Sequence, residues 1–389
     1  MSGKIERALI SVTDKTGVVE LAGELAKRGV EIVASGGTAK AIAGAGLSVT
    51  EISELTGFPE CMDGRVKTLH PKVHGGILAD RDNREHLDRA AELGIGLIDL
   101  VVVNLYRFRE AAADTSLSER DIIEKIDIGG PTLIRSAAKN FHSVAVVVDP
   151  DDYTALLAEM DEHGGKVTLD TRRRLSSKAF HHTASYDTAI SRWFDEREAG
   201  EEESPLPRQL VTVYTRVRPL RYGENPHQAA ALYRQEPPVG RFHEFEQIQG
   251  KELSYNNIQD AWAAFRLARD LGPEACAVMK HANPCGAAAC ATTTESFVRA
   301  RRTDPVSAFG SIVAVNGVVD VDLADASKEG FVEVMIARRF TDEALASLAK
   351  KKNLRILALP DEEWERDLSG LVSSLSLIHI SEPTRLRRI

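Results

Sequence analysis

Residues 7–38 read RALISVTDKTGVVELAGELAKRGVEIVASGGT, and this stretch decides the fold. The apolar run 7–12 predicts a short buried strand, and the apolar spacing over 18–28 predicts an amphipathic helix that ends at Gly29. Residues 31–34 predict the next strand. A strand, a polar loop, a helix and a strand in this order are typical of a doubly wound α/β unit with a parallel sheet.

The same alternation continues through the first half of the chain. A second helix is expected over 39–45 and a short strand over 47–49. The continuous apolar runs 97–103 and 144–148 predict central strands of a parallel sheet, because such strands are buried on both faces. A long helix is expected over 170–194.

A charged segment that contains proline predicts a boundary between two domains. We assign the first domain and its connecting helices to 1–195, a linker to 196–210 and a second α/β region to 211–372. The last stretch, 373–389, fits no expected element and is interpreted as a non-native tail.

The composition argues against several classes of protein. The 389 residues carry a formal net charge of -9 with both signs mixed, which argues against bulk nucleic-acid binding. No apolar stretch reaches the roughly 18 residues of a membrane span, and the N-terminus lacks the apolar run of a signal peptide. The four cysteines form no C-x-x-C pair and no metal-ligand spacing with histidines, so we expect a cytoplasmic protein with reduced thiols.

Two polar loops follow the first strands, at the sheet edge where open α/β sheets bind ligands. In the loop 35–38, two glycines let backbone N–H groups approach a phosphate, and the helix that follows favours an anion. An ordinary helix cap explains the same residues equally well. The loop 13–15 is a weaker signal, because a turn with one lysine is usually only solvated. The candidate nucleotide contacts of these two loops are Thr13, Asp14, Lys15, Ser35, Gly36, Gly37 and Thr38.

A third group of polar residues lies in the segment 65–71 and after the apolar run 97–103. Arg65 and Lys67 alternate on one side of a segment expected to be extended, with Thr68 beside them, and could offer two cations and a hydroxyl to a phosphorylated ligand. A solvated basic loop is the alternative. Asn104 and Tyr106 follow the strongest predicted strand and are expected at the mouth of the crevice.

A fourth group surrounds a further helix. Asp127 precedes a glycine pair, a helix is expected to begin at the following Pro131-Thr132, and Lys139 lies at the end of that helix. Each of these residues alone could be a cap or a surface residue. If folding brings them together with Lys67 and Tyr106, the four form a proton-transfer and oxyanion-stabilising set.

The second region carries its strongest motif over 278–286. An apolar strand delivers Lys280, His281 and Asn283 to its end, where a turn is expected, and the Lys–His pair suits proton transfer. A zinc-deaminase interpretation fails because the H-x-E and P-C-x-x-C elements are missing, so we predict no catalytic metal. Upstream, the segment 220–228 offers an arginine for a phosphate and a tyrosine for a base or ribose, or else a capping loop.

The first region resembles the IMP cyclohydrolase domain of the bifunctional purine biosynthesis proteins over about 7–153. The matching motifs are 11–17, 34–38, 64–71, 104–106 and 126–132. The resemblance implies a fold similar to methylglyoxal synthase and closure of the formylated nucleotide FAICAR to IMP with loss of water. It adds Ile128 to the nucleotide contacts.

The same resemblance implies roles for the reacting groups. Lys67 and backbone N–H groups near Asp127 would hold the formyl oxygen. Tyr106 and Lys139 would move protons, because a nearby cation makes a phenol a better acid. Asp127 would position the carboxamide or help proton transfer. Arg107 stands where the family usually has proline, which removes no reacting group.

The second region, over about 211–360, resembles the AICAR transformylase domain of the same proteins. The matching motifs are 220–228, 250–257, 278–286 and 304–310. The resemblance implies a cytidine-deaminase-like fold without zinc and formyl transfer from 10-formyltetrahydrofolate to AICAR. His281 would take the amine proton, and Lys280 would favour the developing charge or protonate the leaving nitrogen. The implied nucleotide contacts are Arg221, Tyr222, Asn283, Gly310 and Glu333.

Members of this family continue well past the length of this chain and are homodimers with transformylase sites at the subunit interface. We therefore expect a C-terminally truncated chain with impaired formyl transfer, acting on small-molecule nucleotides and folate. An alternative is a nucleotide-binding allosteric regulatory module of the same fold, which leaves the proton-transfer set unexplained. Methylglyoxal synthase itself is disfavoured, because fold alone is a poor guide to function.

Overall fold

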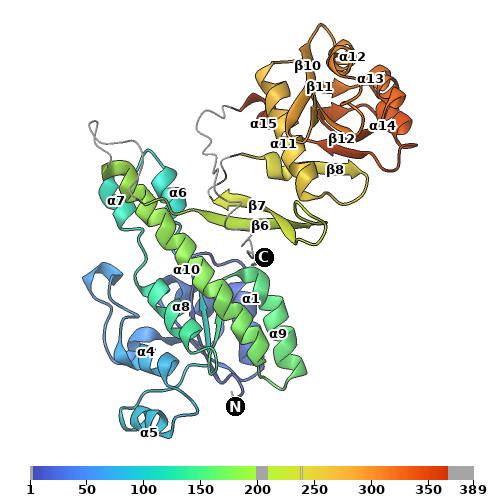
Figure 1. Ribbon diagram of the computed structural model, residues 1–389. Coiled ribbons are helices and arrows are strands. Elements are labelled where there is room, and N and C mark those ends of the chain that lie inside the picture. Colours follow the sequence, from blue (N-terminus) through green and yellow to red (C-terminus); the bar gives the residue numbers. More distant parts are fainter. Residues whose placement is uncertain (1–2, 199–208, 237, 239, 367–389) are drawn as a thin grey trace, which may run out of the picture. The chain divides into compact units, whose positions relative to one another are not determined.

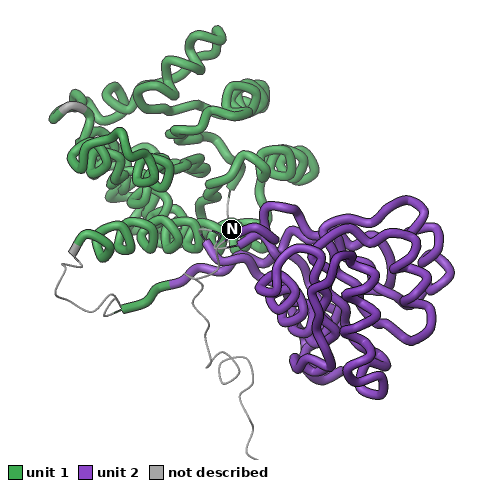
Figure 2. Tube along the Cα trace, turned by 90° about the horizontal axis from the view of Figure 1, so that it is seen from above, with its two compact units in different colours: residues 1–211 green, residues 212–389 purple. Residues whose placement is uncertain are grey.

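The computed structural model describes residues 3–198, 209–236, 238 and 240–366. The chain divides into two compact units, Met1–Val211 and Thr212–Ile389, coloured green and purple in Figure 2. This division lies beside the assigned linker, of which 199–208 lie outside the described residues. The assigned tail, 373–389, also lies wholly outside them.

Unit 1 is built on a five-stranded parallel sheet in the order β3-β2-β1-β4-β5. The chain winds outward from β1 in both directions, so a topological switch point lies between β1 and β4. The predicted doubly wound parallel sheet is therefore confirmed. The strands are β1 Arg7–Ser11, β2 Glu31–Ala34, β3 Thr50–Glu51, β4 Leu100–Val103 and β5 Ala145–Val147.

Helices cover both faces of this sheet (Figure 1). Alternate side chains of each strand enter two cores: one packs with α1, α2 and α9, and the other with α4, α8 and α10. Both faces are buried, which is why the strands are continuously apolar. The helices are α1 Val18–Lys27, α2 Gly36–Gly44, α3 Ile52–Thr56, α4 Pro71–Leu78, α5 Arg84–Glu92, α6 Phe108–Ala113, α7 Glu119–Ile123, α8 Gly129–Lys139, α9 Tyr153–Glu162 and α10 Leu169–Glu198, with 3-10 turns at Met62–Gly64 and Pro150–Asp152.

Two strand predictions were wrong in their limits. The strand expected over 47–49 lies instead at Thr50–Glu51, because these are the residues that pair with β2. The strand expected from residue 97 begins at Leu100, because Ile98 and Asp99 donate their N–H groups to Gly76 and Arg7.

Unit 2 holds a six-stranded mixed sheet in the order β10-β9-β11-β12-β13-β8. Strands β11, β12 and β13 are parallel, and β10, β9 and β8 pair antiparallel to their neighbours. A separate hairpin joins β6 Val213–Leu220 to β7 Ala230–Glu236. The sheet strands are β8 Glu246–Gln249, β9 Ala275–Lys280, β10 Asn283–Ala289, β11 Ser311–Val319, β12 Val332–Phe340 and β13 Arg355–Ala358.

Helices again cover both faces of this sheet. One core includes Phe297 of α12, Leu323 of α13 and Leu348 of α14, and the other includes Phe265 of α11 and Trp364 of α15. The helices are α11 Tyr255–Asp270, α12 Thr293–Thr303, α13 Val321–Ala326, α14 Asp342–Leu348 and α15 Asp361–Glu365, with 3-10 turns at Phe242–Glu244 and Ser327–Glu329. Among the described residues of either unit, no helix is long and apolar enough to cross a membrane.

Candidate functional sites

An anion site forms in unit 1 where β2 meets α2. Ser35 is the N-cap of α2, and Gly36 opens the helix with φ of 44°, in the left-handed region that favours glycine. The Lys67 ammonium lies 3.5 Å from where a Cβ on Gly36 would be, and the Lys15 ammonium lies 3.8 Å from the same position on Gly37. Two cations therefore lie beside the first two residues of α2, and together with the helix N-terminus they suit a phosphate.

Other hydroxyls predicted to contact a phosphate instead stabilise this cradle. Thr38 is buried; its hydroxyl donates to the Val12 carbonyl at 3.0 Å and accepts from the Val12 N–H at 3.1 Å. The Ser35 hydroxyl lies 2.7 Å from that of Ser11. The prediction of a direct phosphate contact from Thr38 is therefore wrong in this structure, because its hydroxyl already holds β1 to α2.

Asn104 also acts on the protein itself. Its side-chain oxygen accepts from the N–H groups of Thr13, at 2.6 Å, and Asp14, at 3.0 Å, and its amide donates to the Asp14 carbonyl at 2.8 Å. The prediction that its amide points into the crevice is corrected: it orders the turn after β1. The Asp14 carboxylate bonds Thr16, which lowers its pKa, and pairs with Arg107 at 3.3 Å.

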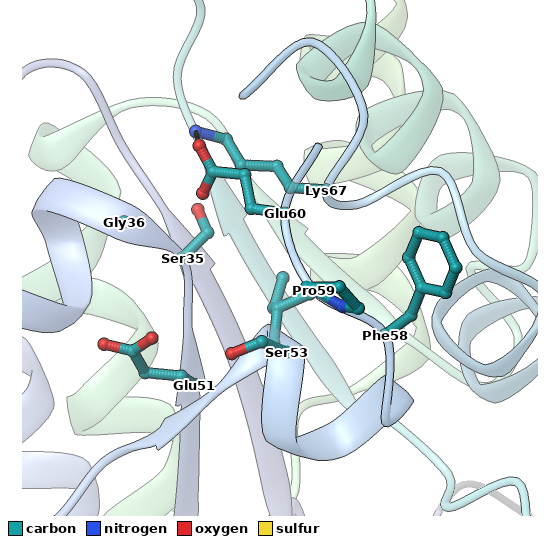
Figure 3. Close-up of a pocket in the computed structure, with 9 residues that line it drawn as sticks. Ser35, Gly36, Glu51, Ser53, Phe58, Pro59, Glu60 and Lys67 are labelled. Carbon is teal, nitrogen blue, oxygen red and sulfur yellow. Dashed lines mark ion pairs between the residues drawn. The ribbon is translucent and has the colours of Figure 1, made fainter. Parts of the chain in front are cut away.

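A pocket of about 250 Å³ opens beside the anion site (Figure 3). Lys67 and Glu60 extend side by side along one side of it, with 3.8 Å between the ammonium and a carboxylate oxygen. The pocket thus has a cationic end and an acidic wall. Its lining residues are Ser35, Gly36, Glu51, Ile52, Ser53, Phe58, Pro59, Glu60 and Lys67.

Tyr106 and Asp127 lie within electrostatic range of each other. Burial raises the pKa of Asp127, opposed by N–H groups of Gly130 and Tyr106 and by the charge of Lys67. Burial also raises the pKa of Tyr106, and the charges of Asp127 and Glu60 raise it further. The expected cation effect on Tyr106 is therefore wrong, because its charged neighbours are carboxylates and its phenol is a weaker acid than usual.

The turn before α8 fixes Asp127 and offers further donors. The carboxylate accepts from the Gly130 N–H at 2.8 Å, while the Asp127 N–H donates to the Tyr186 hydroxyl at 2.9 Å. The Asp127 amide is therefore not available for an oxyanion. The N–H groups of Ile128 and Gly129 have no hydrogen-bond partner among the described residues, and the Thr68 hydroxyl lies 2.6 Å from the position of a Cβ on Gly129.

Lys139 of the predicted set and Arg65 of the predicted phosphate contacts are not where the sequence placed them. Lys139 is the last residue of α8, whereas Asp127 precedes its first turn, and eleven helical residues rise about 15 Å. Folding therefore does not bring Lys139 to Lys67, Tyr106 and Asp127 within one chain. Arg65 is not on an extended segment but ends a 3-10 turn, and its guanidinium pairs with the Glu124 carboxylate.

A second site forms at one edge of the sheet in unit 2. Lys280 ends β9 and lies beside Gly310 just before β11, and the register of the sheet puts Glu333 of β12 and Arg355 of β13 at the same end of the neighbouring strands. Its ammonium donates to the Phe309 carbonyl at 2.9 Å. The Tyr222 carbonyl accepts from the N–H of Tyr255 at the start of α11, 3.0 Å away. The predicted residues of this region are thus gathered at one edge.

His281 sits in a strained hairpin turn at this edge. His281 and Ala282 have φ of 53° and 57°, so two non-glycine residues form the left-handed turn between β9 and β10. Asp260 fixes the turn, because its carboxylate accepts from the Ala282 N–H at 2.7 Å. The turn expected after Asn283 was wrong in position: Asn283 begins β10, and its amide donates to the His281 carbonyl at 2.9 Å.

Two further residues of this edge make contacts within the protein. The Glu333 carboxylate accepts from Asn257 at 3.0 Å and pairs with Arg355 at 3.2 Å, so its predicted nucleotide contact competes with an existing network. The Arg221 guanidinium lies 5.4 Å from the centre of the Tyr222 ring. Gly310, with φ of 76°, is required by the turn before β11.

Sequence reasoning missed several residues at both sites. Glu60 lines the pocket and lies just before the motif 64–71, so its place in the sequence could have marked it as a site residue. Tyr186, Asp260 and Arg355 gave no local signal, because their partners lie 22 to 103 positions away. Within the described residues, no group of three or more His, Cys, Asp or Glu side chains could hold a metal.

Comparisons with known proteins agree with the motifs. A family model described as AICARFT/IMPCHase bienzyme matches residues 137–376, and one described as MGS-like domain matches residues 17–132. A solved structure described as the crystal structure of ForH is 38% identical, with a TM-score of 0.46, and the match covers 49% of this chain and 96% of that one.

Two curated relatives are both named bifunctional purine biosynthesis protein PurH. The relative from Neisseria meningitidis serogroup C is 50% identical over 388 residues, which cover 96% of this chain and 74% of the relative. The relative from Acetivibrio thermocellus is 48% identical over 358 residues, which cover 92% of this chain and 69% of the relative. The N-terminal sheet, the two sites and these matches together place the chain in the AICARFT/IMPCHase bienzyme family.

Proposed function

We propose that unit 1 closes FAICAR to IMP with loss of water, in the formation of purine nucleotides. The observation that carries this proposal is the meeting of Lys67, Tyr106 and Asp127 next to a phosphate cradle at the N-terminus of α2. We assign the activity to 1–195. Lys139 stays outside the proposed set, because it lies at the far end of α8.

The nucleotide phosphate would bind at the start of α2. Backbone N–H groups of Gly36 and Gly37 would donate to it, and Lys15 and Lys67 would neutralise it. The remainder of the nucleotide would extend into the adjoining pocket, whose volume is near that of a small ligand. This placement puts the reacting groups of the base between Lys67 and the start of α8.

The chemistry follows from the ionisation of Asp127 and Tyr106. The carboxamide nitrogen attacks the formyl carbon and gives up a proton, which Asp127 would accept because its raised pKa makes it a stronger base than an ordinary carboxylate. Tyr106, whose pKa is raised, keeps its proton and would donate it to the formyl oxygen. That oxygen leaves as water with a second proton from the formamide nitrogen. The free N–H groups of Ile128 and Gly129 would hold it meanwhile.

Unit 2 would carry the preceding reaction, and we assign it to 211–372. The formyl group of 10-formyltetrahydrofolate passes to the amine of AICAR, which yields FAICAR and tetrahydrofolate. His281 would accept the amine proton, and Lys280 would stabilise the charge on the leaving nitrogen. The strained turn at His281 and Ala282 supports this assignment, because such strain concentrates at functional sites.

Three further features belong to the same proposal. We infer a cytidine-deaminase-like fold without zinc for unit 2, a homodimeric assembly and a cytoplasmic location. The mixed sheet with helices on both faces supports the first. Sedimentation of the purified chain at several concentrations would test the assembly, and a monomer at every concentration would overturn it.

The test of the main proposal uses the purified chain with FAICAR, and follows IMP by ultraviolet absorbance. We expect IMP from FAICAR alone, and Asp127→Asn should lose this turnover. AICAR with 10-formyltetrahydrofolate tests the second reaction. Nucleotide binding by a folded chain that makes no IMP would contradict the proposal and favour the regulatory module.

A further inference from the structure

The long helix α10 reaches the turn that carries Asp127. The Tyr186 hydroxyl accepts from the Asp127 N–H at 2.9 Å and donates to the Lys125 carbonyl at 3.0 Å. Tyr186 is only 9% exposed. The Tyr186 hydroxyl therefore hydrogen-bonds two backbone groups of the turn before α8. This turn carries Asp127, whose carboxylate interacts electrostatically with Lys67 and Tyr106.

The same turn of α10 also holds the segment that follows Tyr106. Arg109 donates to both the carbonyl and the hydroxyl of Ser185, at 3.0 and 2.6 Å. The Phe108 ring packs edge-on against Tyr186, with 6.3 Å between ring centres. Adjacent residues of one helix thus fix the two segments that present Tyr106 and Asp127.

We propose that Tyr186 is a positioning residue for the cyclohydrolase, whose hydroxyl sets the place of Asp127 relative to Tyr106. The proposal rests on the function proposed for unit 1. Tyr186 itself touches the turn and not the reacting atoms, because its hydroxyl is engaged by backbone groups on both sides. Its effect passes through the backbone of Asp127.

The chemistry of the hydroxyl suits this role. Burial raises the pKa of Tyr186 to about 12, so the group stays protonated and able to donate throughout the neutral range. A phenylalanine would keep the ring packing against Phe108 but leave the Asp127 N–H and the Lys125 carbonyl unpaired. The turn would then relax, and its carboxylate would shift and gain water.

The test compares Tyr186→Phe with Ser176→Ala in the full chain. Ser176 is a matched control, because its buried hydroxyl also links α10 to α8 but reaches the Ala138 carbonyl at the far end of that helix. For Tyr186→Phe we expect kcat for FAICAR to fall roughly 10- to 100-fold, as for other partners that orient reacting groups, with KM within about threefold. Ser176→Ala should keep kcat within about twofold.

A second measurement does not depend on turnover. Carbon-13 labelling of aspartate allows the Asp127 carboxyl to be titrated by NMR, and Tyr186→Phe should lower its pKa toward the ordinary range as water enters. An unchanged titration together with an unchanged kcat would overturn the inference, as would equal losses of kcat in both variants. Wild-type chain that makes no IMP would instead refute the proposed function, and the titration would still decide the role of Tyr186.

Discussion

Replacing Gly130 by alanine should separate catalysis from stability in unit 1. A Cβ at this position would lie 2.6 Å from the Asp127 carboxylate oxygen and 2.7 Å from a methyl of Leu105. Ordinary contact begins near 3.4 Å, so the carboxylate must move by about 0.8 Å. Its other oxygen is held by the Gly130 N–H, so the movement turns the carboxylate away from its present direction.

The two consequences have different magnitudes. Crowding of this kind costs about 1 to 3 kcal/mol of stability, partly offset because alanine suits a helix better than glycine. Misplacing a catalytic group by about 1 Å can cost on the order of 100-fold in rate, which corresponds to about 2.7 kcal/mol at the transition state. We therefore expect kcat for FAICAR to fall about 100-fold while the chain remains folded and KM changes little.

Gly23→Ala is the matched control. Gly23 lies within α1, and a Cβ there would meet only a Leu47 methyl at 3.7 Å, which is ordinary contact. This variant should unfold at a slightly higher temperature and keep its kcat. The assay is IMP formation at saturating FAICAR, with thermal unfolding followed by circular dichroism. Gly130→Ala with wild-type kcat would refute the reasoning that the position of the Asp127 carboxylate limits the reaction.

Three other predictions concern charge, strain and the independence of the sites. Asp127→Asn should raise the free energy of unfolding at neutral pH, because burial raises the pKa of Asp127 and the ionised carboxylate therefore destabilises the folded state. This gain should vanish as the pH falls and the wild-type carboxyl becomes protonated. Denaturant titration at several pH values measures it, and a gain that grows in acid would contradict the prediction. Ala282→Gly should stabilise the chain by about 1 kcal/mol, because a φ of 57° is unfavourable for alanine but not for glycine. Ala264→Gly in α11 should instead destabilise the chain by a similar amount or more. The midpoints of denaturant unfolding compare the two variants. Lys280→Met should abolish formyl transfer to AICAR and leave IMP formation from FAICAR unchanged, and loss of both activities would contradict separate sites.

The sequence predicted most of the fold of unit 1 because its signals are local. Buried parallel strands are continuously apolar, and glycines mark the turns, so β1, β2, α1 and the long helix α10 were placed within a few residues. The position of β3 failed because a two-residue edge strand is defined by its pairing with β2 and not by its own composition. The hairpin turn at His281 failed similarly, since neither His281 nor Ala282 is a usual left-handed residue.

The sequence identified several residues of the sites, but the structure corrected the roles predicted for some of them. Lys67, Tyr106 and Asp127 were identified from motifs, and the structure gathers them at one end of the sheet. Motifs do not reveal whether a polar group faces a ligand or the protein, so Thr38 and Asn104 were misjudged. Nor do they give the direction of a pKa shift, which for Tyr106 depends on carboxylates brought from distant segments.

The edge strands β3 and β10 bear on how the protein behaves when it is crowded with copies of itself. An exposed strand edge is a template on which another chain can add a strand and begin to aggregate. In unit 1 the edge strand β3 has only two residues, and in unit 2 the edge strand β10 contains Pro284, which has no N–H to donate. Lengthening β3, or replacing Pro284 by a residue that can donate, would give another copy of the chain an edge on which to add a strand.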